Sequence, residues 1–187
     1  MRIHAGKRAI RALGVSESFT RTDRFSTLAG VVMRADLIVD GFVFGRAEVG
    51  GDDATSGIVK MHRLLNRDDI NVIILSGAVI SHYNVVDVDA LAEKTGTPVI
   101  CLTYKESSGL ETSIRSRFEN PEAKVAAYRK LGERKTLTLK TGKKVYARLA
   151  SISEQDARRI VEAFAREGAF LEPVRVARLL ARARHRD

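Results

Sequence analysis

Carboxylate side chains in the first half of the chain could bind a metal ion or move a proton. Glu17 is the best placed of them, because it lies at the end of the strand expected over residues 8–16. Oxygen ligands suit Mg²⁺, and bound Mg²⁺ can clamp the attacking and leaving oxygens of a phosphodiester. The chemistry that these residues would support is therefore metal-dependent phosphodiester hydrolysis. The candidates are Glu17, Asp40, Glu48, Asp52, Asp53 and Asp87.

Each of these carboxylates also has an ordinary structural explanation. Glu17 could be a solvated charge at a strand end. Asp40 lies in an apolar run, where a buried carboxylate is costly unless it is paired or metal-bound, but it could lie on the strand's polar face or at a bulge at Gly41. Asp53 and Asp87 could be helix caps. Asp53 also follows a Gly-Gly pair, where the backbone could approach a ligand.

A polar loop follows the most apolar short run in the chain. Residues 72–75 predict a strand buried on both faces, and ligands of open α/β sheets bind beyond the carboxyl ends of such strands. We therefore expect Ser76, His82, Tyr83 and Asn84 to contact a substrate. Serine could bind a phosphate oxygen, histidine could orient a phosphate or act as acid or base, and tyrosine could stack on a base. The open alternatives are that His82 has no role and that Tyr83 only packs the loop.

The charge of the chain points to an anionic partner. The net charge is +9 and the isoelectric point is about 10.0, which favours nucleic acid ahead of a membrane surface. Arg175, Arg178 and Arg182 share one face of a predicted last helix and could follow a phosphate backbone. The alternative is a solvated, arginine-rich surface of a thermostable protein.

Composition limits the class of protein. A hydrophobic content of 44% and a charged content of 29% are typical of a soluble globular domain. No apolar run reaches the roughly 18 residues that a membrane span needs, and the basic N-terminus has no apolar core of a secretory signal. The single cysteine, Cys101, excludes a disulfide framework and a cysteine-based zinc site. We expect a cytoplasmic protein with no membrane partner.

The order of elements predicts an α/β fold. Three consecutive strands with short turns, over residues 8–16, 26–34 and 37–44, predict an antiparallel meander, and a strand after a crossover helix is normally parallel to a neighbour. The sum is a mixed sheet with helices on both faces, in the element order of ribonuclease H-like folds. In that order Glu17 and Ser76 become neighbours. We expect one domain, residues 1–187, with a C-terminal hairpin and two-helix extension from about residue 134.

Several stretches together resemble a known family. They are GVSESF (14–19), STLAGVVMRADLIVDGFVF (26–44), EVGGDDAT (48–55), SGAVISHYNVVD (76–87) and EPVRVARLL (172–180). The combination resembles an archaeal family of small proteins named endonuclease dU, which is similar in turn to endonuclease V. The resemblance implies a ribonuclease H-like fold, a divalent metal (Mg²⁺, with Mn²⁺ as an option) and DNA that contains a deaminated base, deoxyuridine or deoxyinosine.

The family's acidic positions are matched only in part. Glu17 matches one member of an acidic pair after the first strand, and Ser76 stands where endonuclease V-like enzymes place an aspartate before glycine. Asp53 and Asp87 match further acidic positions. We therefore expect Glu17, Asp53 and Asp87 to be catalytic, and Glu17, Asp53 and Asp40 to bind the metal.

Three functions remain open from the sequence. The first is a metal-dependent DNA endonuclease that acts at deaminated bases. The second is a weak or inactive nucleic-acid-binding protein of the same fold, which the serines Ser16 and Ser76 favour. The third is an assembly protein whose basic face meets a protein partner. Three carboxylates around one point would favour the enzyme, and carboxylates scattered singly would favour the binder. The expected partner is DNA, with RNA as the alternative.

Overall fold

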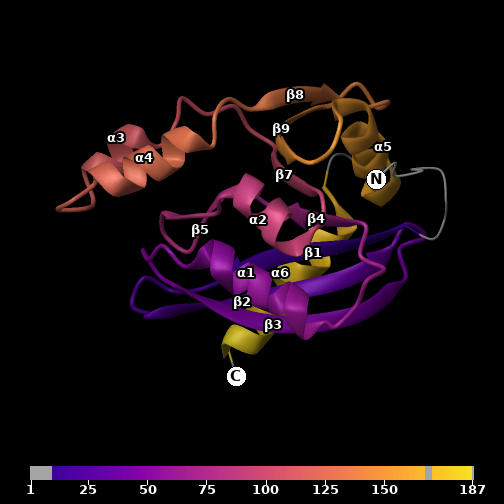
Figure 1. Ribbon diagram of the computed structural model, residues 1–187, viewed down its shortest axis with the longest axis horizontal. Coiled ribbons are helices and arrows are strands. Elements are labelled where there is room, and N and C mark those ends of the chain that lie inside the picture. The colour runs from indigo at the N-terminus through magenta and orange to yellow at the C-terminus, as the bar shows by residue number, and fades with distance from the viewer. Residues whose placement is uncertain (1–9, 167–169, 187) are drawn as a thin grey trace.

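A mixed β-sheet forms the centre of the molecule (Figure 1). The structure is a computed structural model that describes residues 10–166 and 170–186. The strands are β1 (Arg11–Ser18), β2 (Phe25–Arg34), β3 (Val39–Glu48), β4 (Val72–Leu75), β5 (Val79–Ile80), β6 (Asn84–Val85), β7 (Val99–Thr103), β8 (Lys135–Thr138) and β9 (Lys144–Ala150). The helices are α1 (Ala54–Leu64), α2 (Val88–Thr95), α3 (Glu111–Arg115), α4 (Glu122–Lys130), α5 (Glu154–Phe164) and α6 (Glu172–Arg186).

The strand order in the described part of the chain is β3-β2-β1-β4-β7-β9-β8. The three central strands β1, β4 and β7 run parallel, and the remaining neighbours are antiparallel. β5 and β6 pair separately as a short hairpin beside this sheet. The predicted ribonuclease H-like α/β fold, with a meander followed by parallel strands, is confirmed.

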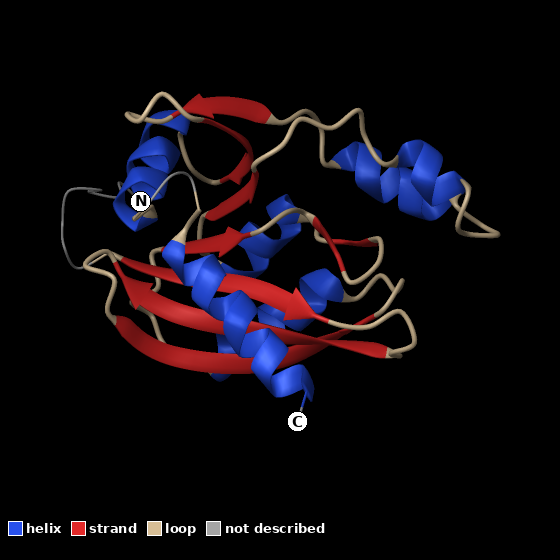
Figure 2. Ribbon diagram, turned by 180° about the vertical axis from the view of Figure 1, so that it is seen from behind, coloured by secondary structure: helices blue, strands red, loops and turns tan. Residues whose placement is uncertain are grey.

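Helices cover both faces of the sheet. The core on one face includes side chains from α1 and α2, and the core on the other face includes side chains from α5 and α6. Figure 2 shows α6 lying across the strands on the face turned away from α1. The predicted placement of helices on both faces is therefore confirmed.

Helix α6 sits close against β1 because β1 has a glycine there. A Cβ atom on Gly14 would lie 2.4 Å from the carbonyl carbon of Pro173, the second residue of α6. No real Cβ atom tolerates that distance, so any side chain at this position would push α6 away. This contact fixes where the arginines of α6 lie relative to the strand ends.

The sheet brings two of the predicted site residues together. β1 and β4 pair in parallel with Val15 opposite Leu75, so their carboxyl ends lie side by side. Glu17 and Ser76 follow that pair and line the same cavity. The predicted proximity of Glu17 and Ser76 is confirmed.

Some element boundaries differ from those expected. β3 continues to Glu48, beyond the predicted end at residue 44, because it keeps pairing with β2 as far as Phe25. The hairpin of β8 and β9 joins the main sheet through β7, and α6 packs on β1 and β2. Residues 8 and 9 of the expected first strand lie outside the described residues.

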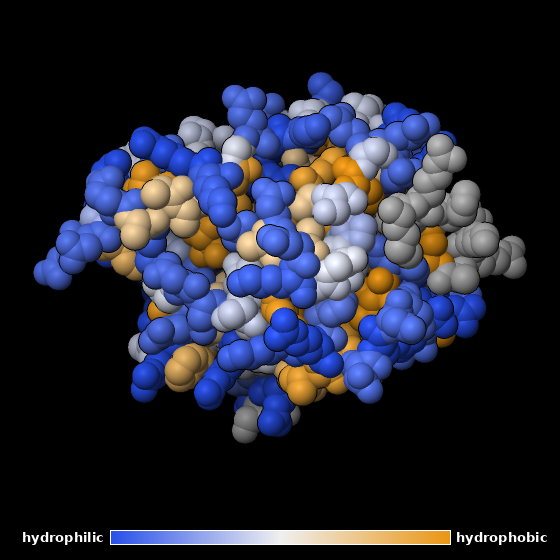
Figure 3. Space-filling view, in the orientation of Figure 1, coloured by the Kyte–Doolittle hydropathy of each residue, from blue (hydrophilic) through white to orange (hydrophobic). Residues whose placement is uncertain are grey.

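The face of the molecule that carries α1 and α2 is largely polar. Hydrophilic side chains cover most of the face in Figure 3, and hydrophobic groups appear between them in separate patches. Among the described helices, none is both long and apolar enough to pass through a membrane.

Candidate functional site

A cavity of about 370 Å³ opens at the carboxyl ends of β1 and β4. Its polar lining consists of Ser16, Glu17, Ser18, Ser76, Arg178 and Arg182. Its apolar lining includes Phe19, Ile58 of α1 and Ile80 of β5. The cavity lies where open α/β sheets bind ligands, and it is the candidate functional site.

Glu17 points toward the face of the sheet that α1 and α2 cover. Side chains alternate along a strand, and Leu13 and Val15 of β1 belong to the core beneath those helices. Glu17 is two residues beyond Val15, so its side chain points to the same face of the sheet. Ser16 has the parity of Gly14, which faces Pro173 of α6, and lies on the opposite side. The cavity therefore has a carboxylate side and a serine side.

The Glu17 carboxylate is held by Ser81. Both the backbone N–H and the hydroxyl of Ser81 donate hydrogen bonds to Oε2 of Glu17. The Ser81 hydroxyl lies 2.5 Å from that of Ser26, which donates to the carbonyl oxygen of Ala47. Burial raises the pKa of Glu17, and the two hydrogen bonds from Ser81 offset only part of that effect. Glu17 therefore accepts a proton at higher pH than a solvated glutamate does, as a general acid or base requires.

The loop that presents Ser81 has an uncommon backbone. Ser81, His82 and Tyr83 are consecutive and have φ angles of 45°, 57° and 68°. Non-glycine residues in this left-handed region cost of order 1–3 kcal/mol each, and such residues cluster at functional sites. Gly50 holds the loop in place, because its N–H donates a hydrogen bond of 2.7 Å to the Ser81 carbonyl oxygen.

His82 and Tyr83 form an aromatic cluster beyond the cavity. Their ring centroids are 5.0 Å apart, and Phe118 lies 5.8 Å from Tyr83. The Arg117 guanidinium lies 5.8 Å from the Tyr83 ring centroid. Burial, followed by the charges of Arg117 and Arg21, lowers the pKa of His82, so its imidazole is more readily neutral than a solvated histidine. The cluster offers ring faces and cationic groups beside the cavity, although neither predicted aromatic residue lines the cavity itself.

Asn84 has a structural role that the sequence did not indicate. Its side chain is buried, and Oδ1 accepts a hydrogen bond of 3.0 Å from the N–H of Ala54, the first residue of α1. Its Nδ2 donates to the Glu48 carbonyl oxygen at 2.9 Å and to Asp53 Oδ1 at 2.8 Å. We predicted that Asn84 contacts a substrate, but its amide is already engaged within the protein.

Asp53 shares this internal network. Its Oδ1 also accepts a hydrogen bond of 2.9 Å from the N–H of Glu48. Asp53 stands at the N-cap position of α1, yet its side chain does not cap the helix, and Asn84 bonds the first amide of the helix instead. Asp53 is absent from the lining of the Glu17 cavity, and its Oδ1 is engaged by the Asn84 amide and the Glu48 N–H.

Asp87 is the N-cap of α2, which confirms the structural alternative. One oxygen accepts a hydrogen bond of 3.0 Å from the N–H of Ala90, and the other lies 2.6 Å from Nζ of Lys130. These interactions, with the Ala90 hydrogen bond first, lower the pKa of Asp87. The residue is also absent from the cavity lining.

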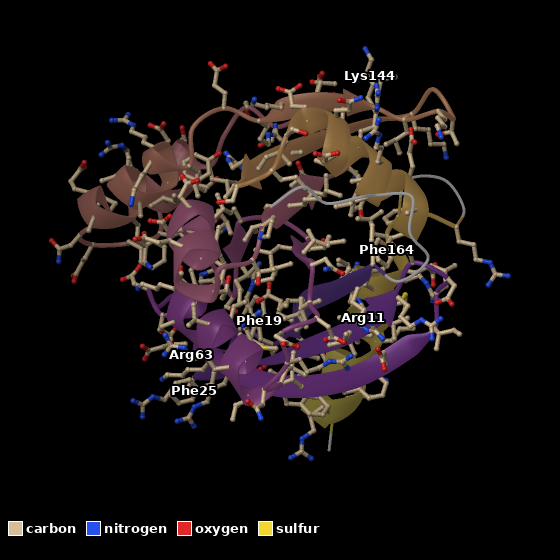
Figure 4. All side chains as sticks on the ribbon, turned by 45° about the vertical axis from the view of Figure 1, so that its right-hand side comes forward. Arg11, Phe19, Phe25, Arg63, Lys144 and Phe164 are labelled. Carbon is tan, nitrogen blue, oxygen red and sulfur yellow. The ribbon has the colours of Figure 1, made fainter. Side chains whose placement is uncertain are left out.

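The prediction that Asp40 shares a metal ion with Glu17 is wrong. Asp40 forms ion pairs with Arg11 and Arg67, and the hydrogen bonds from these arginines lower its pKa. Arg11 begins β1, six residues before Glu17, which corresponds to about 20 Å along the strand. Figure 4 labels Arg11, the first residue of β1, and Phe19, the residue that follows the strand. The carboxylate in the apolar strand is thus paired with arginine at the opposite end of the sheet.

The described donors do not fit a magnesium ion. Within residues 10–166 and 170–186, no three His, Cys, Asp or Glu side chains lie close enough to hold a metal. The cavity offers one carboxylate, one oxygen of which already accepts two hydrogen bonds from Ser81. Its other polar groups are serine hydroxyls and two guanidinium groups, and Mg²⁺ needs an octahedron of oxygens, usually with carboxylates. We therefore derive no chemical step through a metal.

The three predicted arginines of α6 separate into two kinds. Arg178 and Arg182 are exposed, line the cavity and form no ion pair with any described residue. Arg175 does not line the cavity, and its guanidinium pairs with Glu172 at 2.6 Å. Two cationic groups without a carboxylate partner at a strand edge form a site for an anion.

Further arginines lie near the loop that joins β1 to β2. Arg184 borders a second hollow together with Arg46. The guanidinium groups of Arg24 and Arg46 lie 5.1 and 4.7 Å from the ring centroid of Phe25. Arginines from α6, β3 and the β1–β2 loop therefore surround one end of the sheet.

The arrangement defines a class of protein: a ribonuclease H-like domain with a ligand cavity at the ends of its parallel strands. The fold is shared with solved structures from other organisms. A crystal structure of a protein of unknown function from Archaeoglobus fulgidus superposes with a TM-score of 0.81 at 28% identity, covering 93% of this chain and 97% of that one. Endonuclease V from Ciona intestinalis, in complex with DNA containing an inosine, gives 0.64 at 14% identity, covering 95% and 86%.

The family is defined by sequence as well. The model of the endonuclease dU family matches residues 8–185, and the chain belongs to that family. A UPF0215 protein from Pyrobaculum calidifontis is 38% identical over 170 residues, which cover 90% of this chain and 93% of that protein.

Proposed function

We propose that the protein binds nucleic acid at the Glu17 cavity and acts as an endonuclease at deaminated bases in DNA. Membership of the endonuclease dU family supports a nuclease. The observation that carries the placement is the cavity itself, which Arg178 and Arg182 line together with Glu17, a partly buried carboxylate with a raised pKa. A nuclease needs this pairing, with cations for the phosphate and a group that can exchange a proton near it.

The neighbouring residues suit the rest of the substrate. Ser76 is exposed at the end of β4 and could bind a phosphate oxygen. His82 and Tyr83 present ring faces beside the cavity, against which an unstacked base could lie. A deoxyuridine or deoxyinosine would be held there, next to the phosphodiester at Glu17. A protein that acts on chromosomal DNA would work in the cytoplasm.

A second candidate is nucleic-acid binding without cleavage. The observation that favours it is the distribution of the carboxylates: Asp53 bonds Asn84, Asp87 caps α2, and Asp40 pairs with arginines at the far end of β1. Endonuclease activity that depends on Mg²⁺ or Mn²⁺ would need metal ligands that the described residues do not bring together.

The experiment is a cleavage assay on labelled DNA that contains deoxyuridine, deoxyinosine or no lesion. Each substrate is incubated with Mg²⁺, with Mn²⁺ and with EDTA, and a matched RNA is included. Cutting that depends on the lesion supports the endonuclease. Binding of all substrates with no cutting under any condition supports the second candidate, and the absence of both binding and cutting contradicts the proposal.

A further inference from the structure

The side of the cavity that faces α6 carries only hydrogen-bond donors and hydroxyls. Val15 and Leu75 are partners in the parallel register, and Ser16 and Ser76 follow them directly. Ile74 belongs to the core under α6, so Ser76 has the parity that faces α6, as Ser16 does. Neighbouring strands lie about 4.8 Å apart, which places these two serines side by side at the sheet edge.

Helix α6 completes this side with two arginines. Arg178 and Arg182 are four residues apart, so they project from the same face of the helix with Cβ atoms about 6 Å apart. Guanidinium groups have donors only, in a fork that matches the oxygens of a phosphate. Serine hydroxyls can add further donors to the same anion.

No described carboxylate neutralises this group. Arg178 and Arg182 have no ion pair within the described residues, whereas Arg175 on the same helix is paired with Glu172. Glu17 lines the same cavity but points to the other face of the sheet, where Ser81 holds it. The α6 side of the cavity is thus a cationic site, and a divalent cation would be repelled from it.

We infer that Ser16, Ser76, Arg178 and Arg182 bind a backbone phosphate of nucleic acid directly, with no divalent metal ion between protein and phosphate. This inference rests on the proposed function, because it assumes that nucleic acid is the ligand. The inference goes further in assigning the strand-end serines to an anion site. A nuclease with carboxylates at these two positions would instead hold a cation there.

The first test measures binding of a short labelled DNA duplex without a lesion, in EDTA and in low Mg²⁺ at matched ionic strength. We expect the same affinity in both buffers. The Arg178→Ala/Arg182→Ala protein should bind roughly 10- to 100-fold more weakly, because it loses charged hydrogen bonds to the phosphate. Its plot of log affinity against log salt should be shallower by about one unit per lost contact. The control, Arg158→Ala on α5, removes an exposed arginine outside the cavity lining.

The second test adds the carboxylates that a metal site would need. We expect no stoichiometric binding of Mn²⁺ to the natural protein by isothermal titration calorimetry. The Ser16→Asp/Ser76→Asp protein should gain Mn²⁺ binding, and its DNA affinity should become dependent on the metal. Thermal unfolding of both proteins checks that each is folded.

The outcomes separate the inference from the function on which it rests. DNA binding that requires Mg²⁺, stoichiometric Mn²⁺ binding by the natural protein, or an Arg178→Ala/Arg182→Ala protein that binds DNA normally would each overturn the direct phosphate site while leaving nucleic-acid binding intact. A natural protein that binds no DNA or RNA would overturn both.

Discussion

Ser81 donates two hydrogen bonds, from its backbone N–H and from its hydroxyl, to one oxygen of Glu17. The donors come from a loop 64 residues further along the chain, whose backbone is left-handed at three consecutive positions. The loop thereby fixes the direction of the only carboxylate in the lining of the described cavity. The candidate site depends on this long-range contact as well as on the strand end.

The raised pKa of Glu17 predicts how stability changes with pH. Because the folded state binds this proton more tightly than the unfolded state, Glu17 makes the protein less stable as pH rises from its unfolded value, 4.5, through its folded pKa. The Glu17→Gln protein has no carboxyl group to titrate and therefore lacks this loss of stability. The loss amounts to about 1.4 kcal/mol for each unit by which the folded pKa exceeds the unfolded one. Urea unfolding at several pH values should show the variant gaining on the natural protein as pH rises. A constant difference across this range would contradict the raised pKa.

Asn84 should contribute more to stability than to binding. The Asn84→Ala protein loses three hydrogen bonds and leaves the N–H of Ala54 and the Asp53 carboxylate short of a partner. We expect a loss of about 2–4 kcal/mol in the free energy of unfolding, measured by urea denaturation. Nucleic-acid affinity of the folded variant should stay within about twofold; a loss confined to affinity would restore Asn84 as a substrate contact.

Gly14 should be intolerant of a side chain because of Pro173. The Gly14→Ala protein places a Cβ atom against the backbone of α6 and must move the helix. We expect a loss of about 1–3 kcal/mol in stability, as overpacked cores show, and weaker DNA binding because Arg178 and Arg182 move with the helix. Gly41→Ala on β3, where an added Cβ atom meets nothing closer than 3.5 Å, is the matched control. Equal DNA affinity in a folded Gly14→Ala protein would show that the position of α6 does not matter for binding.

The fold was predictable from the sequence because its signals are local. The apolar run of β4 and the meander before it determine the order of the central strands, and parallel pairing then places Glu17 beside Ser76. The sequence likewise allowed two roles for Asp87, a helix cap and a catalytic carboxylate, and the structure shows the cap. Strand ends and helix caps depend on a few residues that are adjacent in the sequence.

The distribution of the carboxylates was not predictable in the same way. Asp40 is paired with Arg11 and Arg67, which are 29 and 27 residues away in the chain, and no local pattern announces such a partner. Ser81 and Phe118 carry no sequence signal either, because their roles arise from a left-handed loop and from contacts with Tyr83. Side-chain partners from distant elements decide which acidic residues remain available.

The most direct test of the Glu17 cavity compares two carboxylate variants on deoxyuridine-containing DNA. Glu17→Ala removes the carboxylate of the cavity, and Asp40→Ala removes a carboxylate of the same sheet that pairs with Arg11 at the opposite end of β1. Initial rates of cleavage are measured for both folded variants and the natural protein. The account predicts that the Glu17→Ala protein loses at least about 100-fold in rate, as general acid–base catalysis contributes, and that Asp40→Ala retains the natural rate. Full activity in Glu17→Ala, or a loss confined to Asp40→Ala, would contradict the placement of the site.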